Sequence, residues 1–381
     1  NALGSAYYNL KKTEQAIIAF KKSINYDEKN LFPYKNLGII YHSLNEYDYS
    51  IKYLKKFIDK SKTIEKDVLI LISNSYAKIN NFDSALNYLK KGLENNQEDI
   101  ILLTEIASLY FKNKNYENSI NFYNKTIKIL PDYAIGYNGI GMAYSEMNNL
   151  RKALINFDKA LKINPSFFDS LVNTGNCLQK IEAYEEAITF YQRALKINGN
   201  NPELLSNIGT LFLKINKGEP AIEKFDEALK IVPENVKIIH NKATAYQQMG
   251  LIDEAKKLFR KAVNLEPNYG DSLLALSYTE KLKIDDPLII KAEKNINKLK
   301  LLDNKSSISF ALAKVYGDNK LYKESSKYLI QANSDYRKTI KFSNQTTQKI
   351  IDIMSGFHDI NPNLINNSSD PCPIFIIGLP R

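Results

Sequence analysis

A sequence pattern recurs every 34 residues along most of the length of this chain. A small residue is followed by an aromatic residue three positions later, a second small residue twelve positions later and a large apolar residue sixteen positions later. One clear period has Gly141, Tyr144, Ala153, Phe157 and the closing Pro165. Periods of this length are typical of arrays that stack one small motif many times. The first small position is held by Gly4, Gly38, Ser73, Ala107, Gly141, Gly175, Gly209 and Ala243.

Within each period the apolar residues are spaced three and four apart, which predicts two amphipathic helices joined by a short turn. Small residues such as Ala153 let the two helices approach closely. A proline such as Pro165 ends the second helix because it cannot continue one. One helical pair cannot bury its own apolar face, so successive pairs must stack on one another. The sequence therefore predicts an all-α solenoid.

This pattern resembles the tetratricopeptide repeat, with one departure: residues such as Tyr34 replace the tryptophan that the family usually has early in the first helix. The resemblance implies a right-handed superhelix of helix–turn–helix repeats. It covers residues 1–268, in which the first repeat is partial, and continues as degenerate and terminal repeat-like helices over residues 269–354. In this weaker part we expect one helix to begin near Gly270 and another at Pro287, because proline is tolerated at the start of a helix.

The composition excludes several classes of site and partner. Two cysteines cannot form a disulfide framework, and we expect Cys177 to be a core residue. Three widely separated histidines lack the spacing of metal ligands, so we expect no metal. The net charge of +10 comes mostly from lysines mixed with acidic residues, so we expect a solvated surface and no nucleic-acid partner. No apolar stretch approaches the roughly 20 residues of a membrane span.

The composition changes after Met354. Breaker and polar residues predict a linker over residues 355–372. Residues 373–381 contain a β-branched and aromatic run at 374–377, which predicts one short buried strand. A lone strand has no partner at the end of a helical array. We therefore expect it to begin an α/β domain that is missing here and lies beyond Arg381. A glycine-containing turn after such a strand is a common way to bind phosphate.

Residues Pro373, Gly378, Pro380 and Arg381 resemble the start of the sulfotransferase family, in which a strand runs into Gly-x-Pro-Arg and then Ser-Gly-Thr-Thr. The resemblance implies that Gly378, Pro380 and Arg381 bind the 5′-phosphate of the sulfate donor, 3′-phosphoadenosine 5′-phosphosulfate (PAPS). The whole arrangement is similar to the bacterial tetratricopeptide-repeat sulfotransferases. It implies transfer of a sulfo group to a hydroxyl acceptor, with protein tyrosine as one candidate, in the cytoplasm, where the donor is made.

Residues 1–381 by themselves are not expected to catalyse sulfuryl transfer. The reaction needs a base that deprotonates the acceptor hydroxyl, and sulfotransferases of this kind carry that base downstream of the phosphate loop. His358 is better explained as a solvent-exposed linker residue. We therefore assign no catalytic residue and no cofactor to the chain itself, and PAPS to the longer protein.

The first helices of the repeats are expected to line a concave groove that binds a protein or peptide. Asparagines recur there at Asn36, Asn173, Asn207 and Asn241, the last three 34 residues apart. An asparagine amide both donates and accepts hydrogen bonds, so such a ladder can bind an extended peptide backbone, as in O-linked N-acetylglucosamine transferase. Alternatively, asparagine is simply common at this position of the repeat. The other groove candidates are Asn138, Asn176, Gln179, Thr210, His240, Thr244 and Gln247.

Three hypotheses about function remain open. The array recruits an acceptor for a sulfotransferase domain, or it is a stand-alone interaction scaffold without catalytic activity, or it accompanies a glycosyltransferase domain. The last hypothesis leaves Pro380 and Arg381 unexplained. The carboxylate clamp that binds a chaperone C-terminus is rejected, because two of its basic positions hold Val172 and Asn241. A repeat fold alone does not choose among these functions.

Overall fold

The structure is a computed structural model that describes residues 1–61, 65–94, 96–299 and 301–339, and it is all α-helical over those residues. Residues 1–233 form one compact unit, called unit 1, and the chain from residue 234 onward forms a second, called unit 2. The predicted linker, the strand at 374–377 and the loop residues Gly378, Pro380 and Arg381 lie outside the described residues.

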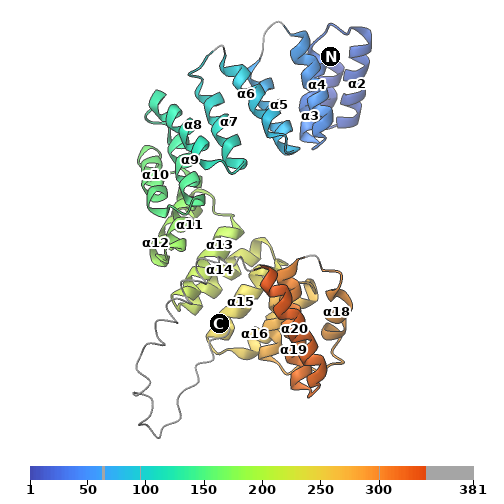
Figure 1. Ribbon diagram of the computed structural model, residues 1–381, viewed down its shortest axis with the longest axis vertical. Coiled ribbons are helices and arrows are strands. Elements are labelled where there is room, and N and C mark those ends of the chain that lie inside the picture. The colour runs from blue at the N-terminus through green and yellow to red at the C-terminus, as the bar shows by residue number, and fades with distance from the viewer. Residues whose placement is uncertain (62–64, 95, 300, 340–381) are drawn as a thin grey trace, which may run out of the picture. The chain divides into compact units, whose positions relative to one another are not determined.

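Within the described residues, unit 1 consists of seven helix pairs that follow one another along the chain (Figure 1). The two helices of each pair pack against each other. The pairs are α1 (Ala2–Asn9) with α2 (Thr13–Tyr26), α3 (Phe32–Ser43) with α4 (Tyr47–Lys60), α5 (Lys66–Lys78) with α6 (Phe82–Leu93), α7 (Ile100–Lys112) with α8 (Tyr116–Ile129), α9 (Ala134–Glu146) with α10 (Leu150–Ile163), α11 (Phe168–Lys180) with α12 (Tyr184–Ile197), and α13 (Pro202–Lys214) with α14 (Gly218–Ile231).

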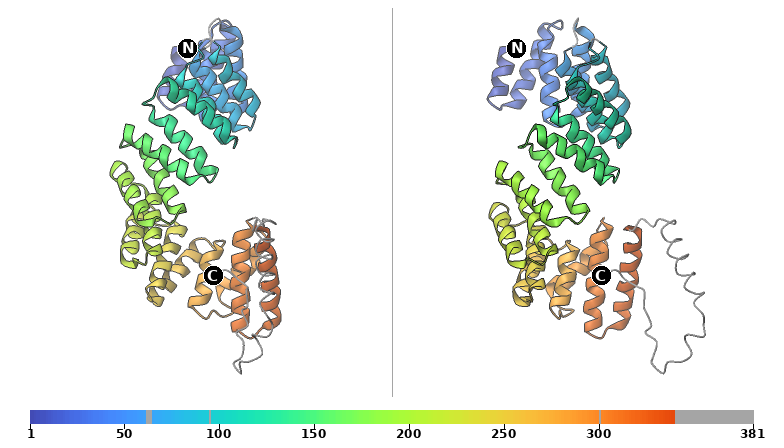
Figure 2. Two further views of the ribbon diagram at one scale, coloured as in Figure 1. Left: turned by 60° about the vertical axis from the view of Figure 1, so that its left-hand side comes forward. Right: turned by 90° about the vertical axis from the view of Figure 1, so that its left-hand side faces the viewer.

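The first helices of neighbouring pairs also contact one another. Such contacts join α3 to α5, α5 to α7, α7 to α9 and α9 to α11. These helices therefore lie side by side in one layer of unit 1 (Figure 2). The second helices from α2 to α12 each pack on their own partner and on the first helix of the next pair. We call the layer formed by α3, α5, α7, α9 and α11 the inner layer.

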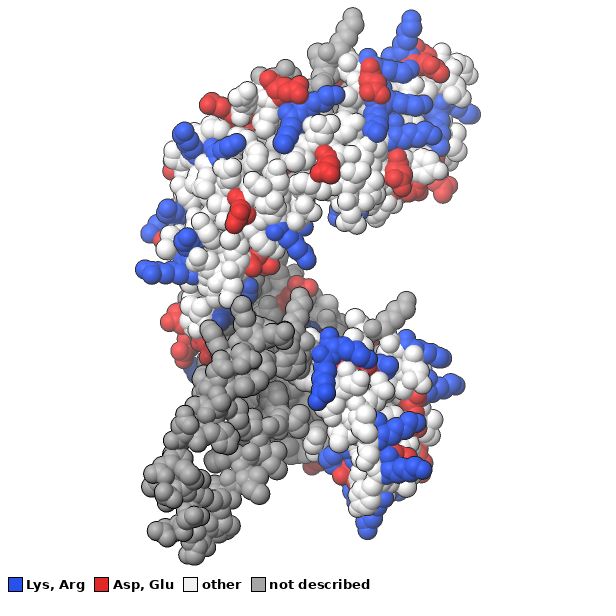
Figure 3. Space-filling view, in the orientation of Figure 1, with Lys and Arg blue, Asp and Glu red and all other residues white. Residues whose placement is uncertain are grey.

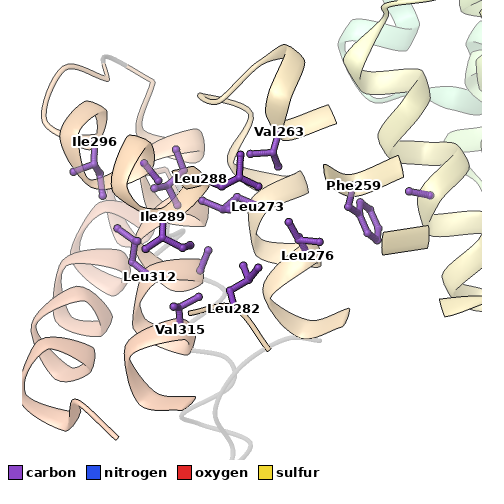
Figure 4. Close-up of a cluster of buried hydrophobic side chains, with 14 of the residues drawn as sticks. Phe259, Val263, Leu273, Leu276, Leu282, Leu288, Ile289, Ile296, Leu312 and Val315 are labelled. Atoms are coloured by element: carbon purple, nitrogen blue, oxygen red, sulfur yellow. The ribbon is translucent and has the colours of Figure 1, made fainter. Parts of the chain in front are cut away.

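Unit 2 begins with one more regular pair and then departs from the repeat. Its helices are α15 (Val236–Gln248), α16 (Ile252–Leu265), α17 (Gly270–Thr279), α18 (Pro287–Ile296), α19 (Leu302–Asp318) and α20 (Tyr322–Thr339). Helices α17 and α18 begin at the two residues that the sequence predicts, and Pro287 occupies the first turn of α18. Side chains from α16 through α19, including Phe259, Leu273 and Leu312, share one buried cluster (Figure 4). This shared core explains why unit 2 starts one repeat before the pattern weakens at residue 268.

The small residues of the repeat do accommodate large neighbours, as the sequence predicts. The ring of Phe157 lies over Gly141, where an added Cβ would stand 2.5 Å from the ring. Gly209 and Phe225 have the same relationship, with a distance of 2.7 Å. Phe157 and Phe225 are buried, so each ring fills the space that the missing side chain leaves between the two helices of a pair.

Aromatic residues twelve positions apart stack on each other between the helices of a pair. The ring centroids of Tyr41 and Tyr53 are 5.6 Å apart, and those of Tyr76 and Tyr88 are 5.7 Å apart. Tyr316 and Tyr328 repeat the arrangement in unit 2 at 5.5 Å. Stacking of this kind adds to the energy of area burial. It shows that these members of the 25 tyrosines are packing residues, as expected from their place in the repeat.

The turn between the two helices of a pair contains one residue with a left-handed backbone. Asparagine is frequent there because it tolerates this conformation better than most residues. Gly250 occupies the same place in the first pair of unit 2, with φ 78°. The non-glycine residues with positive φ are Lys11, Asn45, Asn80, Lys114, Asn148, Glu182, Asn216 and Lys320.

Basic and acidic side chains are interspersed over the face shown in Figure 3, which agrees with the mixed surface predicted from the sequence. No helix in the described part of the chain is long and apolar enough to cross a bilayer.

Candidate functional site

A hollow of about 410 Å³ opens among the first helices of unit 1. Its walls come from α7, α9 and α11, and one residue of α10 closes its floor. We call it the inner hollow. The residues that line it are Phe111, Met142, Ser145, Glu146, Phe157, Asn173, Asn176, Gln179 and Lys180.

The floor of the inner hollow is apolar. Phe157 is 1% exposed and is held over Gly141 by the close packing of α9 and α10. Met142, the residue after that glycine, and Phe111 of α7 are half-buried and complete the floor. A methionine can adapt its shape to what it contacts because its side chain is unbranched.

One wall carries a chain of oriented side-chain amides. Asn138 of α9 is 6% exposed, and its Oδ1 accepts hydrogen bonds from Ser170 Oγ at 2.9 Å and Asn173 Nδ2 at 3.1 Å. Its own Nδ2 donates to the Met142 sulfur at 3.5 Å. Because both ends of the Asn138 amide are engaged, its orientation is fixed. The Nδ2 of Asn173 therefore donates to Asn138, and its Oδ1, which has no partner within the described residues, is left as an acceptor on a residue that lines the hollow.

A buried tyrosine engages the oxygen of the Asn176 amide, whereas at Asn173 it is the nitrogen that is engaged. Tyr191 OH donates to Asn176 Oδ1 at 2.6 Å. Burial raises the pKa of Tyr191 to about 12, so its hydroxyl keeps the proton that it donates. The exposed Asn176 amide thus has its oxygen engaged and its N–H groups available. Asn173 and Asn176 together offer one acceptor and one donor at the same wall.

The rim of the hollow carries one charge of each sign, Glu146 at the end of α9 and Lys180 at the end of α11. Lys180 Nζ reaches Ser145 Oγ at 3.4 Å, and Cys177 Sγ lies 3.3 Å from the same hydroxyl. Cys177 itself is 1% exposed, and burial raises the pKa of its thiol. It is a core residue, as predicted, and not a reactive thiol.

The other predicted groove residues of unit 1 differ in their surroundings. Asn36 Nδ2 donates to Phe32 O of its own helix at 2.8 Å. Asn207 is exposed on α13, and Thr210 Oγ1 donates to Ser206 O at 2.9 Å. The recurring asparagine therefore makes different contacts at Asn36 and Asn173. Its role as a ligand-binding ladder stays a prediction.

His240, Asn241, Thr244 and Gln247 all belong to α15, in unit 2. His240 Nδ1 lies 2.9 Å from Ser272 Oγ, and its ring packs against Phe259 and Tyr269. Burial lowers the pKa of His240. Thr244 Oγ1 donates to His240 O at 3.1 Å. Within its unit, His240 is a packing residue between α15, α16 and the start of α17.

Most residues of the hollow were not predicted from the sequence, although a signal was present. The prediction rested mainly on the asparagine that stands two residues before the small position of the repeat, and among these asparagines Asn173 lines the hollow. The other lining residues of α9 and α11 stand one, four and five residues after Gly141 and Gly175. Met142, Ser145 and Glu146 are the missed residues of α9, and Phe111 and Lys180 hold equivalent positions on α7 and α11.

No group of three or more histidine, cysteine or carboxylate side chains that could hold a metal ion occurs in the part of the chain that the structure describes. The lining of the inner hollow combines hydrogen-bonding amides with an apolar floor, an arrangement suited to binding.

Several solved repeat structures are similar to this chain, at low identity. YrrB, a TPR protein with an unusual peptide-binding site, is 23% identical, covering 54% of this chain and 97% of its own, with a TM-score of 0.43. A thermophilic TPR protein of Thermus thermophilus is 18% identical, covering 48% and 100%, with a TM-score of 0.39. The C-terminal part of a TPR repeat-containing protein from Cytophaga hutchinsonii is 16% identical, covering 62% and 97%, with a TM-score of 0.48. Among curated proteins no match was found.

Models of the tetratricopeptide repeat match residues 1–30, 70–134, 134–167, 168–201 and 236–269, which together make up more than half of the chain. The matched segments contain the helix pairs that form the inner hollow. The chain therefore belongs to the tetratricopeptide-repeat proteins.

Proposed function

We propose that unit 1 is a peptide-binding scaffold and that the inner hollow is its binding site. The observation that carries the proposal is the pair of fixed amides on one wall. Asn173 presents an acceptor because Asn138 holds its Nδ2, and Asn176 presents donors because Tyr191 engages its Oδ1. A peptide unit has one N–H and one C=O, so it can satisfy both amides at once.

The floor adds a place for one apolar side chain of the peptide. Phe111, Met142 and Phe157 surround a space of about 410 Å³, within the roughly 300–1,000 Å³ typical of small-ligand pockets. Burial of one leucine-sized side chain contributes about 1.5–3 kcal/mol. The partner would be held by backbone hydrogen bonds along an extended segment and by one buried side chain. Such binding is expected to be weak and exchangeable.

The proposal is tested by selecting linear peptides from a phage-displayed library on the full chain and measuring their affinity by fluorescence anisotropy. We expect Met142→Lys to weaken the selected peptides about tenfold or more, because it places a charge on the apolar floor. Asn176→Leu is expected to weaken them about fivefold to tenfold through the lost hydrogen bond. The control Asn156→Ala changes an amide on α10 that bonds to Lys152 O and lines no part of the hollow.

Two results would contradict the proposal. One is a library that yields no peptide above background. The other is a set of selected peptides whose affinity is the same for Met142→Lys and for Asn156→Ala, since the peptides would then bind elsewhere. Circular dichroism of each variant establishes that it keeps its helices.

A second candidate function is sulfuryl transfer by a domain that the array serves. The observation that favours it is the run Gly378-Leu379-Pro380-Arg381 after an apolar segment, which lies outside the described residues. The matches reported above are to repeat proteins and add no support for a sulfotransferase. The expected cytoplasmic location depends on this hypothesis, because it follows from the donor PAPS. The hypothesis predicts that the reading frame continues past Arg381 with Ser-Gly-Thr-Thr, and a stop codon there would contradict it.

A further inference from the structure

We propose that the groove of unit 1 selects peptides in which acidic side chains flank an apolar residue. This inference rests on the proposed function and names the class of ligand. The observation behind it is a row of charged residues at one position of the repeat, five residues after the small position. We call it the charge row. Its members end the first helices of successive pairs: Lys78, Lys112, Glu146, Lys180 and Lys214.

The four lysines of the charge row are available to a ligand. All four are exposed, and none pairs with a carboxylate within the residues that the structure describes. Other lysines of first helices behave differently, since Lys66 pairs with Asp99 at 3.0 Å. Lys180 lies on the rim of the inner hollow. Lys112 lines a second, smaller hollow of about 160 Å³ between α5 and α7.

A lysine in the last turn also interacts favourably with the helix dipole, so its position alone does not imply a ligand. Second helices provide the comparison, because Lys128 of α8 and Lys196 of α12 also stand exposed in last turns. These lysines share the dipole with Lys112 and Lys180 but lie on helices outside the inner layer. Binding of a ligand in the groove would therefore depend on Lys112 and Lys180. It would not depend on Lys128 and Lys196.

The spacing of the row sets the spacing of the ligand's charges. Packed helices lie about 10 Å apart, and an extended chain advances about 3.3 Å per residue, so each repeat corresponds to about three peptide residues. Lys112 and Lys180 are two repeats apart. Acidic residues about six positions apart in a peptide would therefore reach both, with the midpoint of the segment over the inner hollow.

The middle of the charge row disfavours an acidic side chain of the peptide. Glu146 stands between the lysines and on the rim of the hollow, where it repels a carboxylate. Phe111, Met142 and Phe157 below it favour an apolar side chain. The charge row and the apolar floor together therefore favour a peptide that has an acidic residue, then an apolar residue, then a second acidic residue. A nucleic acid fits less well, because its evenly spaced phosphates would meet Glu146 as well as the lysines.

The test uses fluorescein-labelled peptides and the full chain at low ionic strength. The acidic peptide is Ser-Asp-Ser-Asp-Gly-Ser-Leu-Ser-Gly-Asp-Ser-Asp-Ser, the neutral peptide has Asn for every Asp, and the third has Asp for the central Leu. We expect the acidic peptide to bind about tenfold more tightly than the neutral one, and the third to bind weakest. Added salt should remove most of the difference between the first two.

Substitutions test whether the lysines of the charge row cause the preference for the acidic peptide. The double variant Lys112→Glu, Lys180→Glu is expected to weaken the acidic peptide about tenfold or more, and by a clearly larger factor than it weakens the neutral peptide. The matched control, Lys128→Glu with Lys196→Glu, makes the same charge change in the last turns of second helices and should leave both peptides within about twofold. Glu146→Gln should improve binding of the peptide with a central Asp.

Each contrary outcome has its own meaning. Equal binding of the acidic and neutral peptides overturns this inference and leaves the proposed function standing. Failure of both leucine-containing peptides overturns the inference and contradicts the proposed function as well. Equal loss in the two double variants shows a response to total charge and overturns the role of the row. A single-stranded oligothymidylate that displaces the acidic peptide and depends on Lys112 and Lys180 would make nucleic acid the ligand of the row.

Discussion

Asn173 Nδ2 donates a hydrogen bond of 3.1 Å to Oδ1 of Asn138, across the contact between α9 and α11. Asn138 is 6% exposed and also accepts from Ser170 Oγ, so it lies beneath the groove surface. The two residues therefore have different roles in the site. Asn138 positions the amide, and Asn173 presents it.

Replacing Asn138 should reduce both stability and binding. Asn138→Ala leaves Ser170 and Asn173 without their shared acceptor in a buried place. We expect a loss of about 1–3 kcal/mol in the free energy of unfolding, measured by urea denaturation. Peptides selected on the wild-type protein should bind several-fold more weakly, because Asn173 is no longer oriented. An Asn156→Ala control should change neither quantity by much, and full retention of peptide affinity in Asn138→Ala would refute the positioning role.

Gly141 tests the close packing inside a repeat. An added methyl group would stand 2.5 Å from the ring of the buried Phe157. Gly141→Ala should therefore destabilise unit 1 by about 1–3 kcal/mol through overpacking. At Gly199 the nearest atom to an added Cβ is Leu195 O at 3.7 Å, so Gly199→Ala serves as the matched control. Equal stability of the two variants in thermal unfolding would show that the contact is not tight.

The left-handed turn residues offer a way to stabilise the array. Glu182 has φ 62°, a conformation that costs a residue with a Cβ more than it costs glycine. Glu182→Gly is expected to raise the free energy of unfolding by about 0.5–1 kcal/mol. The reverse change at Gly250, where φ is 78°, should lower it by about the same amount. Chemical denaturation of both variants decides the point, and a loss of stability in Glu182→Gly would contradict it.

His240 should make unit 2 sensitive to acid. Burial lowers its pKa below the ordinary value of 6.5, while Asp271 acts in the opposite direction. The unfolded chain then binds a proton at a higher pH than the folded one. The stabilisation is therefore present above pH 6.5 and is lost as the pH falls below it.

Hydrogen exchange of α15 and α16 at pH values on either side of 6.5, corrected for the intrinsic rate, measures this effect within unit 2. His42 in unit 1 also has a lowered pKa, so a whole-protein melt would mix the two contributions. His240→Gln cannot gain a proton and should show less acid sensitivity. An equal acid response in the variant and the wild type would assign the effect to other groups.

Much of the fold follows from the sequence because the repeat is defined by small and large residues at fixed positions. Gly141 and Phe157 must meet if two helices are to pack closely, and this contact is seen. Pro287 marks a helix start because its fixed φ suits the first turn of a helix. The division into units at residue 233 was not predictable in the same way. It depends on the cluster that joins Phe259 to Leu273 and Leu312, and such long-range packing leaves no local signal.

The candidate site could be predicted only in part, and for a physical reason. A repeated asparagine signals a shared place in the sequence, but hydrogen bonds decide its role. Asn173 and Asn176 line the hollow as expected, whereas Asn138 lies beneath it and Asn36 bonds to its own helix. The floor was missed because Met142 and Phe111 are ordinary apolar residues in the sequence. Only the rotation of each helix shows that they face the groove.

Methionine methyl NMR can show whether the inner hollow holds a side chain of the bound peptide. The chain has four methionines, of which Met142 lies in the floor of the hollow and Met249 in unit 2. The protein is labelled at its methionine methyl groups, Met142→Leu assigns the signal, and a peptide selected from the library is titrated in. If a peptide side chain enters the hollow, the Met142 signal will shift or broaden strongly while the Met249 signal stays unchanged. A saturated complex in which the Met142 signal does not move would contradict this placement of the peptide side chain.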